Sequence, residues 1–98
     1  MTYSEHINIQ VPNIQKWVHD SANGLASNYG IFLSQSEIEH VSSYIKLLIQ
    51  ELDKNPSYDE FIEALAKKDL YEALKLADTT NIRAIYIYAQ WIYNYSPM

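Results

Sequence analysis

Residues 34–52 read SQSEIEHVSSYIKLLIQEL, and this stretch decides the fold class. It opens with Ser34 followed three positions later by Glu37, the spacing of a capping box, in which each side chain accepts a hydrogen bond from the other residue's backbone N–H. Apolar residues then recur at steps of three and four; they are Ile38, Val41, Ile45, Leu48 and Leu52. Because this period places them on one face of a helix, the stretch predicts an amphipathic helix that is stopped by Asn55-Pro56.

The neighbouring segments carry similar helix signals. Before this stretch, one helical face is traced by apolar residues that end at a glycine suited to a left-handed cap; the face consists of Ile14, Trp17, Val18, Leu25 and Tyr29, and the cap is Gly30. After it, the tetrapeptides Ser57-Tyr58-Asp59-Glu60 and Asp69-Leu70-Tyr71-Glu72 have the form of further capping boxes. They predict two short helices.

Two segments are ambiguous between helix and strand. In His6 to Val11, apolar and polar residues alternate, which predicts a short N-terminal strand or extended arm. Residues 82–95 fit a strand by alternation and by their Tyr, Ile and Trp content. Their length without Gly or Pro exceeds that of a usual strand, so we expect a helix. Two adjacent stripes are then available, Ile82-Ile85-Ala89-Ile92 and Ala84-Tyr88-Trp91-Tyr95.

Length and composition favour one small helical domain. The chain has 98 residues, of which two are Gly, three are Pro and none is Cys. A chain of this size builds one core, and so few turn residues disfavour a many-stranded barrel or sandwich. We therefore expect an all-α protein with a single domain over residues 1–98. Its architecture would be a compact bundle of four to five helices, with or without the N-terminal strand.

Charge and motif content disfavour several classes of function. The net charge is −5 and the isoelectric point is near 5.0, which disfavours nucleic-acid binding. Phosphate-binding and hydrolase motifs are absent from the sequence. His19-Asp20-Ser21 cannot converge as a triad on one helix, and one Glu37-x-x-His40 is too little for a di-iron site. We expect a non-enzymatic, cytoplasmic protein without cofactor or metal. No signal peptide or membrane segment is expected.

Carboxylates gather between residues 51 and 63 with only Lys54 to offset them. We name this set, together with the tyrosine among them, the acidic corner: Glu51, Asp53, Tyr58, Asp59, Glu60 and Glu63. Negative charge beside an aromatic ring suits recognition of Lys- and Arg-rich surfaces. The acidic corner is therefore the first predicted site, with a basic protein as its partner.

The C-terminal segment supplies the second predicted site. Nine tyrosines occur in the chain, and four of them flank Trp91 between residues 86 and 95. Tyr and Trp are enriched at interface hot spots. Tyr88, Trp91 and Tyr95 are accordingly predicted to contact a partner, or a second copy of the chain in a homodimer.

In size, charge, helicity and tyrosine content the chain resembles small bacterial immunity proteins, which neutralise toxins. The resemblance is limited to these overall properties, without a shared residue motif. It implies an inhibitor that occludes the active face of a basic toxin or nuclease domain, with carboxylates in place of substrate phosphates. Two alternatives stay open: an acidic DNA mimic that serves a phage or mobile element in counter-defence, and a regulatory or structural homodimer.

Overall fold

The fold is built around one long helix, α3 (Gln35–Leu52), which begins at the predicted capping box. Ser34 Oγ accepts a hydrogen bond from the Glu37 N–H at 3.2 Å, and the Glu37 carboxylate accepts one from the Ser34 N–H at 2.9 Å. The predicted apolar face is buried at Ile38, Val41, Ile45 and Leu48, and half-buried at Leu52. Helical period and capping chemistry thus predicted this element correctly.

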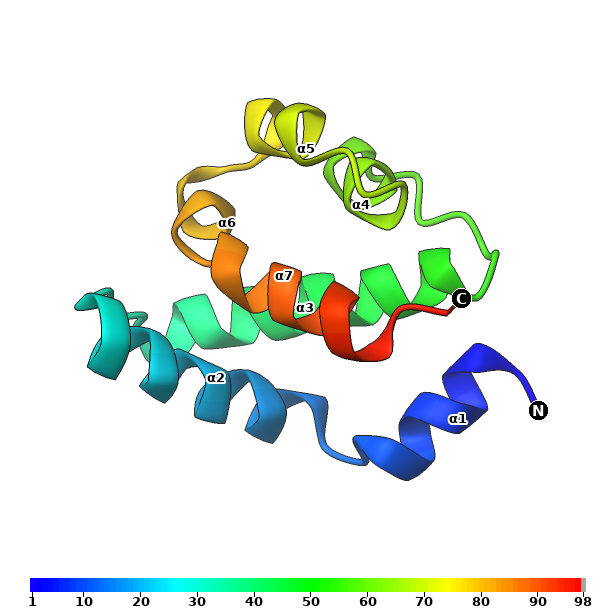
Figure 1. Ribbon diagram of the computed structural model, residues 1–98, viewed down its shortest axis with the longest axis horizontal. Helices are drawn as coiled ribbons and strands as arrows, with labels where there is room; N and C mark the ends of the chain where they lie inside the picture. Colours follow the sequence, from blue (N-terminus) through cyan, green and yellow to red (C-terminus); the bar gives the residue numbers. More distant parts are fainter. Residues whose placement is uncertain (98) are drawn as a thin grey trace.

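The computed structural model describes residues 1–97, which form seven helices and no strand. Besides α3 these are α1 (Tyr3–Gln10), α2 (Ile14–Tyr29), α4 (Glu60–Ala66), α5 (Leu70–Leu76), α6 (Thr79–Arg83) and α7 (Ile85–Tyr95). Helix α3 contacts α1, α2, α4 and α6, while α7 packs against α2, α4 and α6. In Figure 1, α1 and α2 lie below α3 and α7, and α4, α5 and α6 arch above them. The all-α prediction is confirmed, with more helices than the four to five expected.

The predicted N-terminal strand or extended arm is wrong, because this segment is helix α1. Thr2 caps it by accepting a hydrogen bond from the Glu5 N–H. Of the three alternating apolar residues, Ile7 and Val11 are buried, whereas Ile9 is 68% exposed. Since positions 7 and 11 lie one helical turn apart, the pair fits a helix, and only Ile9 made the pattern look like a strand.

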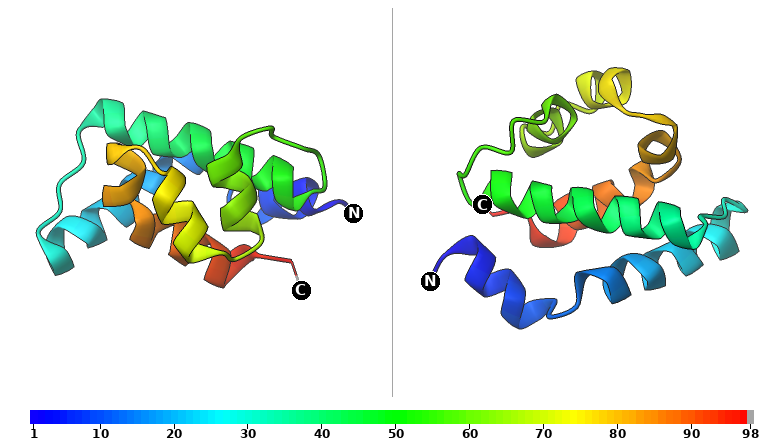
Figure 2. Two further views of the ribbon diagram at one scale, coloured as in Figure 1. Left: turned by 90° about the horizontal axis from the view of Figure 1, so that it is seen from above. Right: turned by 180° about the vertical axis from the view of Figure 1, so that it is seen from behind.

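Helix α2 has the boundaries and the cap that the sequence predicts. Asn13 accepts a hydrogen bond from the Lys16 N–H at its start, and Gly30 ends it with φ +67°. That left-handed backbone is one that glycine adopts without steric cost. The antiparallel α2 and α3 are the two long helices seen from behind in the right panel of Figure 2.

The two short helices α4 and α5 are capped by aspartates. Asp59 accepts from the Ile62 N–H, and Asp69 accepts from the Glu72 N–H. The predicted box beginning at Ser57 is therefore displaced by two residues, because Asp59 takes the capping role. Helix α5 buries Ala73 but leaves Leu70 and Leu74 exposed. Helix α5 therefore exposes an apolar face to solvent.

The C-terminal segment is helical, as expected, but it breaks at Ala84 into α6 and α7. Ala84 has φ −95° and ψ 10°, and its side chain is fully buried. Of the two candidate stripes, the one with Tyr88 and Trp91 faces the core, and the one with Ile85 and Ala89 faces outward. The buried apolar residues of α1, α2, α3, α4, α5 and α7 form one cluster.

Candidate binding surfaces

The acidic corner occupies the end of α3, the loop that follows it and the start of α4. In Figure 1 this loop leaves the end of α3 and rises to α4. Three carboxylates of the acidic corner accept hydrogen bonds inside the molecule, and one of them is Asp59, which caps α4. Glu51 accepts hydrogen bonds from the Ser57 N–H at 3.0 Å and from Ser57 Oγ at 2.9 Å, so it fixes the loop. Both hydrogen bonds use Oε1, so one oxygen of the Glu51 carboxylate is committed to the loop.

Asp53 fixes helix α1 to the end of α3. Its carboxylate accepts from the Tyr3 N–H at 3.1 Å and from Ser4 Oγ at 2.8 Å. The first N–H groups of a helix lack partners within the helix, and a carboxylate there also complements the helix dipole. Asp53 thus holds two elements together, a role that the sequence did not reveal.

Tyr58, Asp59 and Glu60 of the acidic corner line a hollow of about 290 Å³. We name this hollow the acidic pocket; it is lined by Tyr44, Tyr58, Asp59, Glu60, Phe61, Leu76, Asp78 and Asn81. Glu60 is exposed, and Glu63 is half-buried one turn further along α4. The Tyr58 side chain is 87% exposed on a backbone with φ 61°. Rings and carboxylates from both ends of the α4–α5 hairpin therefore meet at one place.

The field in the acidic pocket is negative. Burial, together with the charges of Asp59 and Asp78, raises the pKa of Tyr44 above its ordinary value. Burial and the same two carboxylates also raise the pKa of the Tyr88 hydroxyl, which lies deeper in the core. A nearby negative charge disfavours loss of a proton from a tyrosine, and by the same rule it favours a bound cation.

Neutralising groups near the acidic pocket are few. The imidazole of His40 lies 2.9 Å from an Asp78 carboxylate oxygen, and its ring also contacts Tyr44. Within residues 1–97, neither Asp59 nor Glu60 forms an ion pair with Lys or Arg. The pocket thus keeps negative charge that a cationic group from outside could compensate.

The second predicted site, in the C-terminal segment, is largely wrong. Tyr88 and Trp91 are both 0% exposed, and Tyr95 is half-buried. The Trp91 ring packs edge-on against Trp17 with centroids 4.9 Å apart, and its Nε1 donates to the Tyr3 hydroxyl at 3.2 Å. These side chains belong to the core because the helix buries the stripe that meets α2, so Tyr88 and Trp91 cannot serve as surface contacts in this conformation.

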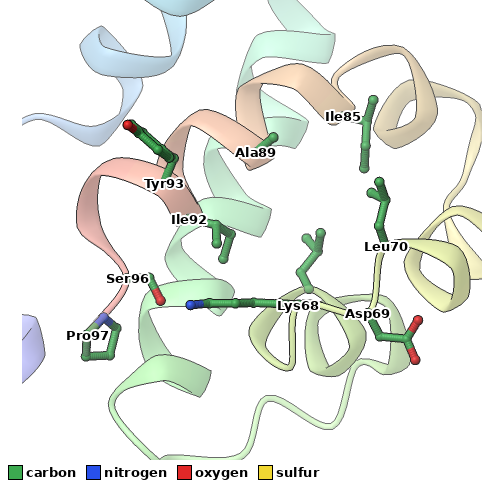
Figure 3. A pocket seen from close by; sticks show the side chains of 10 residues that line it. Lys68, Asp69, Leu70, Ile85, Ala89, Ile92, Tyr93, Ser96 and Pro97 are labelled. Carbon is green, nitrogen blue, oxygen red and sulfur yellow. The ribbon is translucent and has the colours of Figure 1, made fainter.

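An apolar groove lies on the other side of α7. We name it the α7 groove; its volume is about 480 Å³, and its walls are Leu65, Lys68, Asp69, Leu70, Ile85, Ala89, Ile92, Tyr93, Ser96 and Pro97. Figure 3 shows Ile85, Ala89 and Ile92 on the α7 side and Leu70 opposite them. The sequence offered the stripe that lines this groove as one of two options. The choice between the stripes depends on tertiary packing.

No group of three or more metal-ligating side chains occurs within residues 1–97. In the same part of the chain no helix is both long and apolar enough to cross a membrane. The single Glu37-x-x-His40 motif is divided between two tasks: Glu37 caps α3 and pairs with Arg83, and His40 contacts Asp78.

Comparisons with known proteins do not assign the chain to a family. No family model matches it, no curated protein matches it, and no solved structure matches its fold. The two surfaces just described are therefore interpreted from their own chemistry.

Proposed function

We propose that the protein is a non-enzymatic inhibitor that binds a basic protein through the acidic pocket. The observation that carries this proposal is the convergence of Asp59, Glu60 and Asp78 with two tyrosine rings around one hollow. A carboxylate pairs with Lys or Arg by charge and hydrogen bonds, and a tyrosine face attracts the same cation. The partner would insert one such side chain into the pocket.

The wider acidic corner would add steering to this contact. A negative patch speeds the encounter with a basic surface and selects against acidic ones. Nucleases are suitable partners, since a surface that binds phosphates also accepts carboxylates. A cytoplasmic immunity protein that occludes the active face of a toxin is the class of protein that combines these features.

Charge pairing elsewhere favours this proposal over a DNA mimic. Asp20, Glu37 and Glu72 each pair with a Lys or Arg of the chain, at 2.8, 2.6 and 3.4 Å respectively. A mimic of a phosphate backbone needs rows of unpaired carboxylates along its length. Of the eight carboxylates that form no ion pair within residues 1–97, five belong to the acidic corner. This concentration at one place fits recognition of one basic patch on a protein.

The carboxylates are tested by removing their charge while keeping their hydrogen bonds. The double variant Asp59→Asn with Glu60→Gln retains an N-cap oxygen at position 59, because Asn caps as well as Asp. Its matched control is Glu5→Gln with Asp20→Asn. This control removes the same number of negative charges as the pocket variant, but from α1 and α2. In an NMR titration with N-acetyl-arginine amide, we expect millimolar binding that shifts the Tyr44, Tyr58 and Asn81 amides. N-acetyl-norleucine amide serves as the uncharged probe.

The Asp59→Asn, Glu60→Gln variant should raise the dissociation constant of the arginine probe by about tenfold, equivalent to about 1.4 kcal/mol. The control variant should leave that constant unchanged. Shifts confined to other surfaces, or equal binding of both probes, would exclude the pocket as a cation site.

The inhibitor class is tested by co-expressing a basic protein encoded beside this gene. Growth should be rescued by the wild-type chain and less by the pocket variant. Toxicity that persists despite formation of a complex would contradict inhibition.

The ring of Tyr58 is tested by Tyr58→Gly. Because a side chain at positive φ is strained, this variant should keep the free energy of unfolding or raise it by up to about 1 kcal/mol. Lys54→Gly is the matched control, since Lys54 has φ 65° in the same loop. Only Tyr58→Gly should weaken binding of the arginine probe. Equal loss in both variants would assign the effect to loop flexibility and not to the ring.

A further inference from the structure

The exposed side of α7 is unusual in carrying no charge. No Asp, Glu, Lys or Arg occurs between Ala84 and Pro97, although the chain as a whole has a net charge of −5. Tyr93 is 90% exposed, and Ile85 and Ile92 are half-buried at the wall of the α7 groove. Surface helices ordinarily place charged residues on their outer face. This side of α7 therefore has the composition of a face that is covered.

Exposed apolar side chains extend beyond the groove itself. On the flanking helices, Tyr71 is 74% exposed, Leu74 is 38% exposed and Ile82 is 47% exposed. A small ligand in the groove would leave these side chains in water. A macromolecule that sits on the groove can extend onto the neighbouring helices, and exposed apolar surface on soluble monomers often marks such contacts.

We propose that the occupant is a second copy of this chain, in a dimer with two-fold symmetry across the α7 groove. Two copies that each carry a net negative charge repel one another over most of their surfaces. The uncharged α7 side removes that repulsion locally.

Charges at the groove are complementary to a rotated copy of themselves. Lys68 and Asp69 are adjacent, and Figure 3 shows the lysine extending across the groove toward Ser96 while the aspartate points the other way. Lys68 forms no ion pair within residues 1–97. In a two-fold interface the same patch meets itself, so Lys68 of each copy would pair with Asp69 of the other.

Shape also favours self-association. Ala89 is exposed between the larger Ile85 and Ile92, so two α7 helices can approach closely there; helix separation depends on the side chains at the contact. The Tyr93 ring is 90% exposed at the edge of the α7 groove, and in the proposed dimer each ring would pack against the groove of the other copy. The patch thus presents both a projection and the cavity that receives it.

Sedimentation equilibrium of the full chain tests the dimer and its location. We expect a dimer at about 100 μM, a concentration that reveals micromolar association. Ala89→Glu should raise the dissociation constant by at least about tenfold, because it places two carboxylates at the symmetry axis. Asn94→Glu is the matched control, since it gives the same net charge on the same helix outside the groove and should leave the constant nearly unchanged. Circular dichroism checks that both variants fold.

A second pair of variants tests the charge pairing. Lys68→Glu should weaken the dimer because the new carboxylate faces Asp69 of the other copy, and adding Asp69→Asn should recover part of that loss while keeping the cap of α5. A monomer at all concentrations would overturn the proposal. So would a dimer that tolerates Ala89→Glu, or a Lys68→Glu variant that dimerises as tightly as the wild type.

Discussion

At the scale of single residues, the hydrogen bond between Asn81 and Tyr88 is notable because both side chains are buried. Asn81 is 1% exposed, and its side-chain oxygen accepts a hydrogen bond from the Tyr88 hydroxyl inside the core. A buried polar atom that loses its partner retains the full cost of leaving water. This pair joins α6 to the first half of α7.

Tyr88→Phe tests that contact. The variant leaves the Asn81 oxygen unpaired in the core and should lower the free energy of unfolding by about 1–3 kcal/mol. Tyr93→Phe, which removes a hydroxyl from a ring that is 90% exposed, should change it by under about 0.5 kcal/mol. Both values come from urea unfolding. Equal stability of the two variants would mean that the buried hydrogen bond contributes nothing net.

At the scale of the elements, α1 depends on a contact that is distant in sequence. Asp53 accepts two hydrogen bonds from the first turn of α1, about fifty residues earlier in the chain. Short helices are marginal in water without tertiary support. The carboxylate therefore stabilises the position of α1 as well as its first turn.

Asp53→Ala should lower the free energy of unfolding by about 1–2 kcal/mol, and amide hydrogen exchange should rise first at Ile7 and Val11. Asp53→Asn keeps one acceptor oxygen, so its free energy of unfolding should fall by less than that of Asp53→Ala. If exchange rose equally in α4, the carboxylate would be stabilising the loop after α3 and not α1.

Local patterns predicted some elements and missed others for identifiable reasons. The α3 capping box is local, so Ser34 and Glu37 sufficed to locate its start. The break at Ala84 has no Gly or Pro to mark it, so no local signal in the sequence locates it. The start of α1 does have a local signal, because Thr2 accepts a hydrogen bond from the Glu5 N–H at the same spacing as Ser34 and Glu37, and the alternating pattern of residues 6–11 concealed it.

The candidate sites divide in the same way. The acidic corner could be located from residues 51–63 because its members are close in sequence, whereas Asp78 and Tyr44 join the pocket only through folding. Tyr88 and Trp91 were predicted as contacts because a helix offers two stripes and composition does not say which one is buried. Charge density is readable from sequence, but exposure is not.

At the scale of the whole molecule, one ion-pair network joins the two halves of the chain. Arg83 donates to the Glu37 carboxylate at 2.6 Å and also to the backbone carbonyl of Phe32, and Thr80 Oγ1 donates to the same carboxylate at 3.3 Å. Glu37 thus caps α3 and anchors α6 to it. Together with the contact between Tyr3 and Trp91, this network ties the C-terminal helices to the N-terminal ones.

The network predicts how stability depends on acid. The hydrogen bond from the Ser34 N–H, followed by the charge of Arg83, holds the pKa of Glu37 below its ordinary value of 4.5. A carboxyl group whose pKa is depressed by folding contributes stability that is present above the unfolded-state value and is lost as the pH falls through the folded-state value. The contribution of Glu37 should therefore be complete near neutrality and disappear progressively below about pH 4.5.

Glu37→Gln tests this dependence, because it removes the titrating group and keeps an oxygen that can accept the Ser34 N–H. The variant should be less stable than the wild type at pH 7, and the difference between them should shrink as the pH falls to about 3. Glu5→Gln, on an exposed residue of α1, serves as the control and should follow the wild-type curve. The stabilities of the wild type and both variants are compared by their urea unfolding midpoints across this pH range. A constant difference between wild type and Glu37→Gln would show that the contact with Arg83 acts through shape and hydrogen bonding, with no contribution from the carboxylate charge.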